Sequence, residues 1–167
     1  MSRIETALES DGPSILEITA KAGVFNSTEV SCVEELWNEY KKYKERSGYN
    51  FLVYRDDDGS ILGFTCYGPH ALTLGTYDLY WIAVDPDMRG RGIGGALLSH
   101  VESEIENRGG RMVLIETSDT EPYTNARHFY ERNGYHFEAL IRDFYAPGDG
   151  LVFFAKSLAK VPSQHSL

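Results

Sequence analysis

The stretch Arg89-Gly90-Arg91-Gly92-Ile93-Gly94-Gly95 decides the fold, because it joins a strand-like run, residues 79–84, to an apolar helical run that starts at residue 96. Its glycines let the backbone approach a ligand closely, and the free N–H groups and dipole of a helix start attract negative charge. The two arginines add forked donors that suit phosphate oxygens. A strand, a glycine-arginine turn and a helix in this order predict a pyrophosphate-binding loop.

The same loop also fits the dinucleotide-binding fingerprint, as Gly90-x-Gly92-x-x-Gly95 with Glu116 about 20 residues further on. Three features disfavour that interpretation. Residues 85–88 separate the strand from the glycines, the arginines are not needed where backbone amides bind phosphate, and only 72 residues follow Gly95. So short a remainder cannot supply the other strands of a six-stranded doubly wound sheet.

Residues 84–94 resemble the acyl-coenzyme A motif of the GNAT N-acetyltransferases, Gln/Arg-x-x-Gly-x-Gly/Ala after a strand that ends in Val-x-Pro. Arg89, Gly92 and Gly94 hold the three defining positions. A second block, residues 125–135, resembles the later motif of that family, Asn-x-x-x-x-x-Tyr followed by Gly-Phe/Tyr. The two blocks stand in the order of the family, with one helix and one strand between them. The resemblance covers at least residues 77–156.

Length and composition bound the remaining possibilities. A chain of 167 residues predicts one domain, residues 1–158, with a tail at 159–167. The net charge of −9 disfavours a nucleic-acid partner, and no apolar run approaches the roughly 20 residues that a membrane span needs. The first residues lack the features of a signal peptide, and Cys32 and Cys66 are isolated thiols without metal-ligand spacing. These observations predict a cytoplasmic protein without a metal.

The periodicity of apolar residues and the turn residues predict an α/β chain of mixed α+β type. We expect four helices, at 12–22, from 26–28 to near Gly48, at 94–107 and at 124–133, and strands at 50–55, 61–67, 77–84, 112–117, 135–142 and 151–157, with a loop at 145–150. The GNAT fold usually begins with a further strand, which residues 1–8 would supply. The resemblance implies a mixed, mostly antiparallel sheet of six to seven strands flanked by about four helices.

The resemblance also implies how acetyl-coenzyme A binds. In the family the pantetheine arm pairs with the strand before the phosphate loop, which places Ile82, Ala83 and Val84 beside it, with an amide near Ala83 polarising the thioester carbonyl. The pyrophosphate would lie on the loop, and Asn125 would contact the pantetheine arm. Tyr130 would protonate the departing thiolate, because its hydroxyl has a suitable basicity. The residues expected to bind the pyrophosphate are Arg89, Gly90, Arg91, Gly92, Ile93, Gly94 and Gly95.

Two carboxylates are alternatives for the general base that deprotonates the acceptor. Glu116 ends a strand of buried type, and Asp78 lies earlier on the pantetheine strand, where strand alternation would place Asp78, Tyr80 and Ile82 on one face. Water chains serve instead of a dedicated base in some members. Other polar side chains are expected to lie outside these roles. Arg127 and His128 are expected to be solvated helix residues, and His70, His100 and His136 are expected to be structural or exposed.

The acceptor is expected to be an amine, bound by the loops at 24–27 and 143–150. Phe25, Asp143, Tyr145 and Asp149 are the candidate contacts, and the carboxylates would suit a cation. An exposed edge of the last strands would allow a homodimer. The prediction is therefore an N-acetyltransferase that uses acetyl-coenzyme A and an amine in a ternary complex. The alternative is a catalytically silent acyl-coenzyme A-binding module, which would not require a leaving-group acid at Tyr130.

Overall fold

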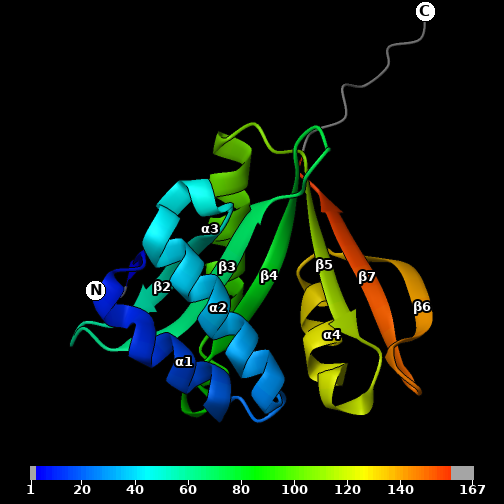
Figure 1. Cartoon of the computed structure of the whole chain (residues 1–167), viewed down its shortest axis with the longest axis horizontal. Coiled ribbons are helices and arrows are strands. Elements are labelled where there is room, and N and C mark those ends of the chain that lie inside the picture. Colours follow the sequence, from blue (N-terminus) through cyan, green and yellow to red (C-terminus); the bar gives the residue numbers. More distant parts are fainter. Residues whose placement is uncertain (1–2, 159–167) are drawn as a thin grey trace, which may run out of the picture.

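The computed structural model describes residues 3–158, so the predicted tail at 159–167 lies outside the described residues. Seven strands form one sheet in the order β1-β2-β3-β4-β5-β7-β6, in which β4 and β5 are parallel and every other neighbouring pair is antiparallel (Figure 1). The strands are β1 (Arg3–Thr6), β2 (Asn50–Arg55), β3 (Ile61–Pro69), β4 (Thr76–Val84), β5 (Met112–Ser118), β6 (His136–Ala146) and β7 (Asp149–Ser157), and the helices are α1 (Gly12–Lys21), α2 (Ser27–Tyr43), α3 (Ile93–Asn107) and α4 (Thr124–Arg132).

Helices cover both faces of the sheet, as a mixed sheet with crossover helices requires. On one face α1 and α2 bury Ile15, Val33 and Trp37 against β2 and β3. On the other face α3 and α4 pack on the sheet through a second cluster that contains Leu98, Val101 and Tyr130. The predicted fold class, strand number and helix number are confirmed, including the first strand expected within residues 1–8.

The start of α2 shows why its sequence forms a helix there. Asn26 accepts a hydrogen bond from the Glu29 amide at 2.9 Å, and the Glu29 carboxylate accepts one from the Asn26 amide at 2.7 Å. This reciprocal capping satisfies two N–H groups that a helix start leaves without partners. The α-helix ends at Tyr43 and not near Gly48, because Lys44 takes a positive φ of 50° and a short 3₁₀ turn follows.

The last hairpin differs from the expectation of a loop at residues 145–150. β6 continues to Ala146 and β7 begins at Asp149, so only Pro147 and Gly148 form the turn, with Gly148 at a φ of 79°. The strand register shifts before Ala146, and Asp143 within that segment has a φ of 54°. Residues 145–150 were predicted as a loop because this irregular segment interrupts the alternation of a regular strand.

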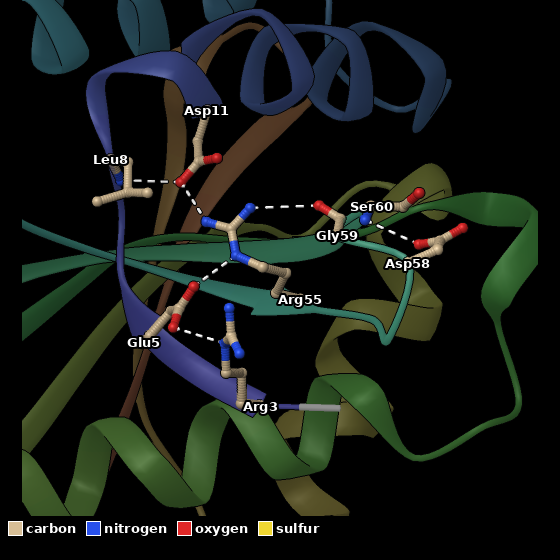
Figure 2. A network of polar contacts seen from close by, with 8 residues as sticks. All are labelled: Arg3, Glu5, Leu8, Asp11, Arg55, Asp58, Gly59 and Ser60. Carbon is tan, nitrogen blue, oxygen red and sulfur yellow. Dashed lines mark hydrogen bonds and ion pairs between the residues drawn. The ribbon is translucent and has the colours of Figure 1, made fainter. Parts of the chain in front are cut away.

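A partly buried ion network joins β1 to β2 and to the segment before α1 (Figure 2). Arg55 on β2 donates to the carboxylates of Glu5 and Asp11, and to the Gly59 carbonyl in the turn after β2. Asp11 is almost fully buried and also accepts a hydrogen bond from the Leu8 amide at 2.8 Å. The positive charge of Arg55 compensates the carboxylates of Glu5 and Asp11. Because breaking such a pair would leave an unpaired charge, the network holds β1 and the start of α1 against the hairpin of β2 and β3.

Candidate active site

The site is built where β4 and β5 separate. The two strands pair only from Thr76 to Asp78 on β4, opposite Met112 to Leu114 on β5, and then diverge (Figure 1). β3 stays paired with the other edge of β4 as far as Val84. Residues 79–84 of β4 therefore present a strand edge that no described strand covers, and such an edge offers backbone groups to an extended ligand. Ile82, Ala83 and Val84, predicted beside pantetheine, lie on this edge.

β4 contains a β-bulge at Tyr80. Cys66 and Tyr67 are adjacent on β3, whereas their partners on β4 are Trp81 and Leu79, so Tyr80 is the extra residue. Leu79 packs in the core under α3, while Trp81 packs on the opposite face against the core under α1 and α2.

The bulge makes one expectation wrong. Beyond it Ile82 packs on the same side as Leu79, under α3. Asp78, which precedes Leu79, faces the opposite side. Asp78 and Ile82 thus lie on different faces of the sheet, because the inserted Tyr80 reverses the alternation that a regular strand would keep.

The glycine-arginine loop runs directly into α3. Gly92 is the N-cap of α3 at a φ of 75°, and no side chain caps the first N–H groups of the helix. Gly90 also has a positive φ of 81°. A Cβ atom at either glycine would meet no atom within 4 Å, so the space above the loop is open. Free amides at a helix start beside open space suit a pyrophosphate.

Gly94 and Gly95 differ in what surrounds them. A Cβ atom at Gly94 would lie 3.3 Å from the ring of Phe129, so this glycine brings α3 close to α4. A Cβ atom at Gly95 would lie 3.8 Å from the side chain of Asn133, which is ordinary contact. The side chains of Arg89 and Arg91 are exposed and are available to phosphate oxygens.

The end of α1 is tied to this loop. The Lys21 ammonium lies 2.9 Å from the Asp85 carboxylate and 2.7 Å from that of Asp87, and these hydrogen bonds raise the pKa of Lys21. The Arg89 guanidinium donates to the Ala22 carbonyl at 3.4 Å. Contacts between α1 and the phosphate loop therefore position the segment between α1 and α2, which holds Phe25.

Tyr130 lies on α4 among aromatic side chains. Its ring is buried, with centroids 6.2 Å from Tyr135 and 5.9 Å from Phe154. Burial raises the pKa of Tyr130 to about 12. Within residues 3–158 its hydroxyl has no hydrogen-bond partner, so the proton is free for a ligand. Asn125 is exposed in the first turn of the same helix.

Glu116 and Asp78 lie on the same face of the sheet. Asp78 pairs in register with Leu114, and Glu116 is two residues further along β5. Glu116 keeps solvent contact, yet partial burial raises its pKa, repulsion by Asp78 adds to that rise, and His70 opposes it. His70 Nδ1 lies 2.7 Å from Asp78 Oδ2. The two candidate bases are therefore neighbours, and His70, expected to be structural or exposed, is bonded to one of them.

Aromatic side chains gather between the segment before α2, β4 and the segment before α4. The ring of Phe25 packs edge-on against Trp81 at 4.9 Å and lies 6.5 Å from Tyr123. The Tyr123 hydroxyl donates to Glu29 at 2.8 Å, which links the start of α2 to the segment before α4. The pKa of Tyr145 is raised first by burial and then by the charge of Glu116.

Two further residues named in the sequence analysis, Asp143 and Arg127, make hydrogen bonds within the fold. The Asp143 carboxylate accepts a hydrogen bond from the Gly148 amide at 2.7 Å inside the turn of the last hairpin, so contact between Asp143 and the acceptor stays a prediction. Arg127, expected to be solvated, is half-buried and donates to the carbonyls of Ser118 and Thr120 at 2.7 and 2.8 Å. Arg127 thereby fixes the start of α4 to the end of β5.

The site residues that the sequence did not predict are those that contact one another from different parts of the chain. Trp81, Tyr123 and Glu29 belong to three elements and carry no motif. Their only signal in the sequence is their type, since an aromatic ring with a polar tip is common at binding surfaces. Among residues 3–158 no three His, Cys, Asp or Glu side chains gather as a metal ion would need. None of the described helices has the length and apolar character to cross a membrane.

A strand edge that no described strand covers, beside an uncapped helix start, suits an acyltransferase that uses a coenzyme, because it can pair with an extended arm and receive a pyrophosphate. Residues 47–137 match the family model of the acetyltransferase (GNAT) domain. A protein of known structure from Desulfovibrio desulfuricans, assigned to the GNAT family, is 35% identical, with a TM-score of 0.91 over 95% of this chain and all of that one. The chain belongs to the GNAT acetyltransferase family. The predicted family and the predicted N-acetyltransferase function are thereby confirmed.

Two more distant proteins share this fold. The ribosomal protein bS18-alanine N-acetyltransferase of Escherichia coli is 27% identical over 151 residues, which are 90% of this chain and 91% of that protein. Its crystal structure superposes with a TM-score of 0.76 at 21% identity and full coverage of both chains. A protein from Salmonella typhimurium, solved with its cofactor acetyl-coenzyme A, has a TM-score of 0.74 at 17% identity, over 100% of this chain and 99% of that one.

Proposed function

We propose that this acetyltransferase takes an acetyl group from acetyl-coenzyme A and transfers it to a cationic primary amine, by direct attack within a ternary complex. The observation that carries the proposal is the uncovered edge of β4 at residues 79–84, which leads into the uncapped start of α3. Acetyl-coenzyme A fits both features, since its pantetheine arm is extended and its pyrophosphate is anionic. Open space above Gly90 and Gly92 supports that fit.

In the proposed reaction the amine nitrogen attacks the thioester carbon and the carbonyl oxygen gains negative charge. A backbone amide near Ala83 stabilises that oxygen. Before the attack Glu116 removes a proton from the acceptor ammonium, which frees the nitrogen lone pair, and Tyr130 donates its proton to the sulfur as the carbon–sulfur bond breaks. The raised pKa of Glu116 supports its role as a base, and the pKa of about 12 keeps Tyr130 protonated at neutral pH.

The cationic acceptor is proposed from a cluster of aromatic side chains and the carboxylate that contacts it. Phe25, Trp81 and Tyr123 form an aromatic wall, and aromatic faces attract ammonium groups. The Glu29 carboxylate lies behind that wall, on Tyr123. An ammonium group would thus meet aromatic faces and negative charge together. The Escherichia coli relative, named for the alanine of a ribosomal protein, makes a peptide amino terminus one candidate within this class.

The test is release of free coenzyme A thiol from acetyl-coenzyme A with three acceptors: a peptide that begins with alanine, a polyamine and an aminoglycoside. Turnover with at least one, and a loss of kcat/KM in Phe25→Ala with unchanged binding of acetyl-coenzyme A, are expected. Absence of turnover with every amine, despite saturable coenzyme binding, would favour the catalytically silent module. The predicted cytoplasmic location and homodimer do not enter this proposal and stay predictions.

A further inference from the structure

We propose that His70 and Asp78 form a charge-tuning pair, in which His70 is a positioning residue that acts through Asp78 to keep Glu116 ready to accept a proton. This inference rests on the proposed function, because it assigns a role toward the proposed general base. No motif contains His70, which stands six residues before β4 begins.

The pair has a fixed geometry. His70 Nδ1 and Asp78 Oδ2 are 2.7 Å apart, and the side chain of Asp78 is only 15% exposed whereas that of His70 is 45% exposed. The loop that carries His70 is held on both sides of it. The His70 amide donates to the Thr76 carbonyl at 2.8 Å, and the Thr73 hydroxyl donates to the His70 carbonyl at 2.8 Å. The imidazole is therefore presented to Asp78 by a closed turn.

The pair stands at the point where β4 and β5 cease to pair. Asp78 and Leu114 are the last residues paired between the two strands, and Glu116 is the next residue of β5 on that face. Asp78 and His70 act on Glu116 in opposite directions, the first raising its pKa and the second lowering it. Tyr145 on β6 is a further ionisable group near Glu116, since its pKa is raised by burial and then by the charges of Glu116, Asp149 and Glu29.

This arrangement has a chemical consequence for the base. A carboxylate accepts the proton of the acceptor only while it is ionised. Negative charge on Asp78 alone would favour the protonated form of Glu116, whereas a protonated His70 offsets that charge. Through its contact with Asp78, His70 thereby keeps Glu116 ionised to lower pH than Asp78 alone would allow.

The experiment measures the titration of Glu116 directly, by NMR of protein labelled at the glutamate side-chain carboxyl carbons, with Glu116→Gln used to assign the resonance. Two variants separate the members of the pair. His70→Gln keeps a donor beside Asp78 but cannot become charged, and Asp78→Asn removes the negative charge. His100→Gln is the matched control, because His100 pairs with Glu104 on α3 at 3.6 Å. The pH profile of kcat/KM is recorded for the same proteins.

The two variants are expected to shift the titration in opposite directions. His70→Gln moves the midpoint of Glu116 and the acid limb of kcat/KM to higher pH, and Asp78→Asn moves both to lower pH. His100→Gln leaves both unchanged. If His70→Gln lowers thermal stability but leaves the titration midpoint of Glu116 unchanged, the pair only stabilises the loop between β3 and β4 and the inference is overturned.

The proposed function can fail separately. The NMR titration needs no turnover, so a protein without acetyltransferase activity would still report the effect of the pair on Glu116. Conversely, an acid limb that persists in Glu116→Gln would remove Glu116 from the role of base, whatever the titration shows.

Discussion

Replacing Tyr130 by Phe removes one hydroxyl from a side chain on α4. This change is expected to lower the catalytic rate without lowering the stability of the fold. Since that hydroxyl has no hydrogen-bond partner among the described residues, its loss breaks no contact within the fold. We expect the free energy of unfolding to change by no more than about 0.5 kcal/mol. The same hydroxyl is the proposed proton donor to the leaving thiolate, and loss of a general acid costs about 10²–10⁴ in kcat. Binding of acetyl-coenzyme A should persist.

Tyr135 supplies the matched control, because it lies in the same aromatic cluster with its ring centroid 6.2 Å from that of Tyr130. Its hydroxyl donates to the Glu102 carboxylate at 3.0 Å. A hydrogen bond to a charged group contributes about 1.5–3 kcal/mol, and in a domain of this size 1 kcal/mol corresponds to about 2–4 °C in Tm. Tyr135→Phe should therefore lower Tm by about 3–12 °C and leave kcat near its original value.

The assays are thiol release for kcat, calorimetric titration for coenzyme binding and thermal unfolding for Tm. The pH profile tests at which pH the rate falls, because only the protonated form of Tyr130 acts as an acid. With a pKa of about 12, Tyr130 should produce no fall in rate up to about pH 10. The reasoning is refuted if Tyr130→Phe retains kcat within about threefold, or if it loses as much stability as Tyr135→Phe.

Two other predictions concern arginines, first those of the loop before α3 and then Arg55 on β2. The double variant Arg89→Ala, Arg91→Ala should weaken binding of acetyl-coenzyme A about 10²–10⁴-fold, since it removes two hydrogen bonds to a charged group and each contributes about 1.5–3 kcal/mol; calorimetry checks this against Arg46→Ala, an exposed change beyond α2 that should leave Kd unchanged. Arg55→Met should destabilise the protein by about 3–5 kcal/mol, because it leaves the buried Asp11 carboxylate without its ionic partner; a change below about 1 kcal/mol in denaturant unfolding would contradict this.

The features that the sequence determined are local in the chain. The phosphate loop was predictable because its glycines, its arginines and the flanking strand and helix lie within about 20 consecutive residues. The order of helices and strands follows from apolar periodicity, and the role proposed for Tyr130 comes from its distance from Asn125 in a motif. The first turns of α2 were predictable for the same reason, since Asn26 and Glu29 cap each other within four residues.

The tertiary structure decided the features that depend on register and on contacts between distant segments. The bulge at Tyr80 reversed the faces of β4 because the pairing with β3 inserts a residue that no local pattern reveals. Arg127 became an anchor because the end of β5 brings carbonyls to it. Likewise, Asp78 and Glu116 share one face because β4 and β5 are parallel and in register before they diverge. A chain pattern specifies which elements form, whereas the chemistry between them depends on how those elements pair.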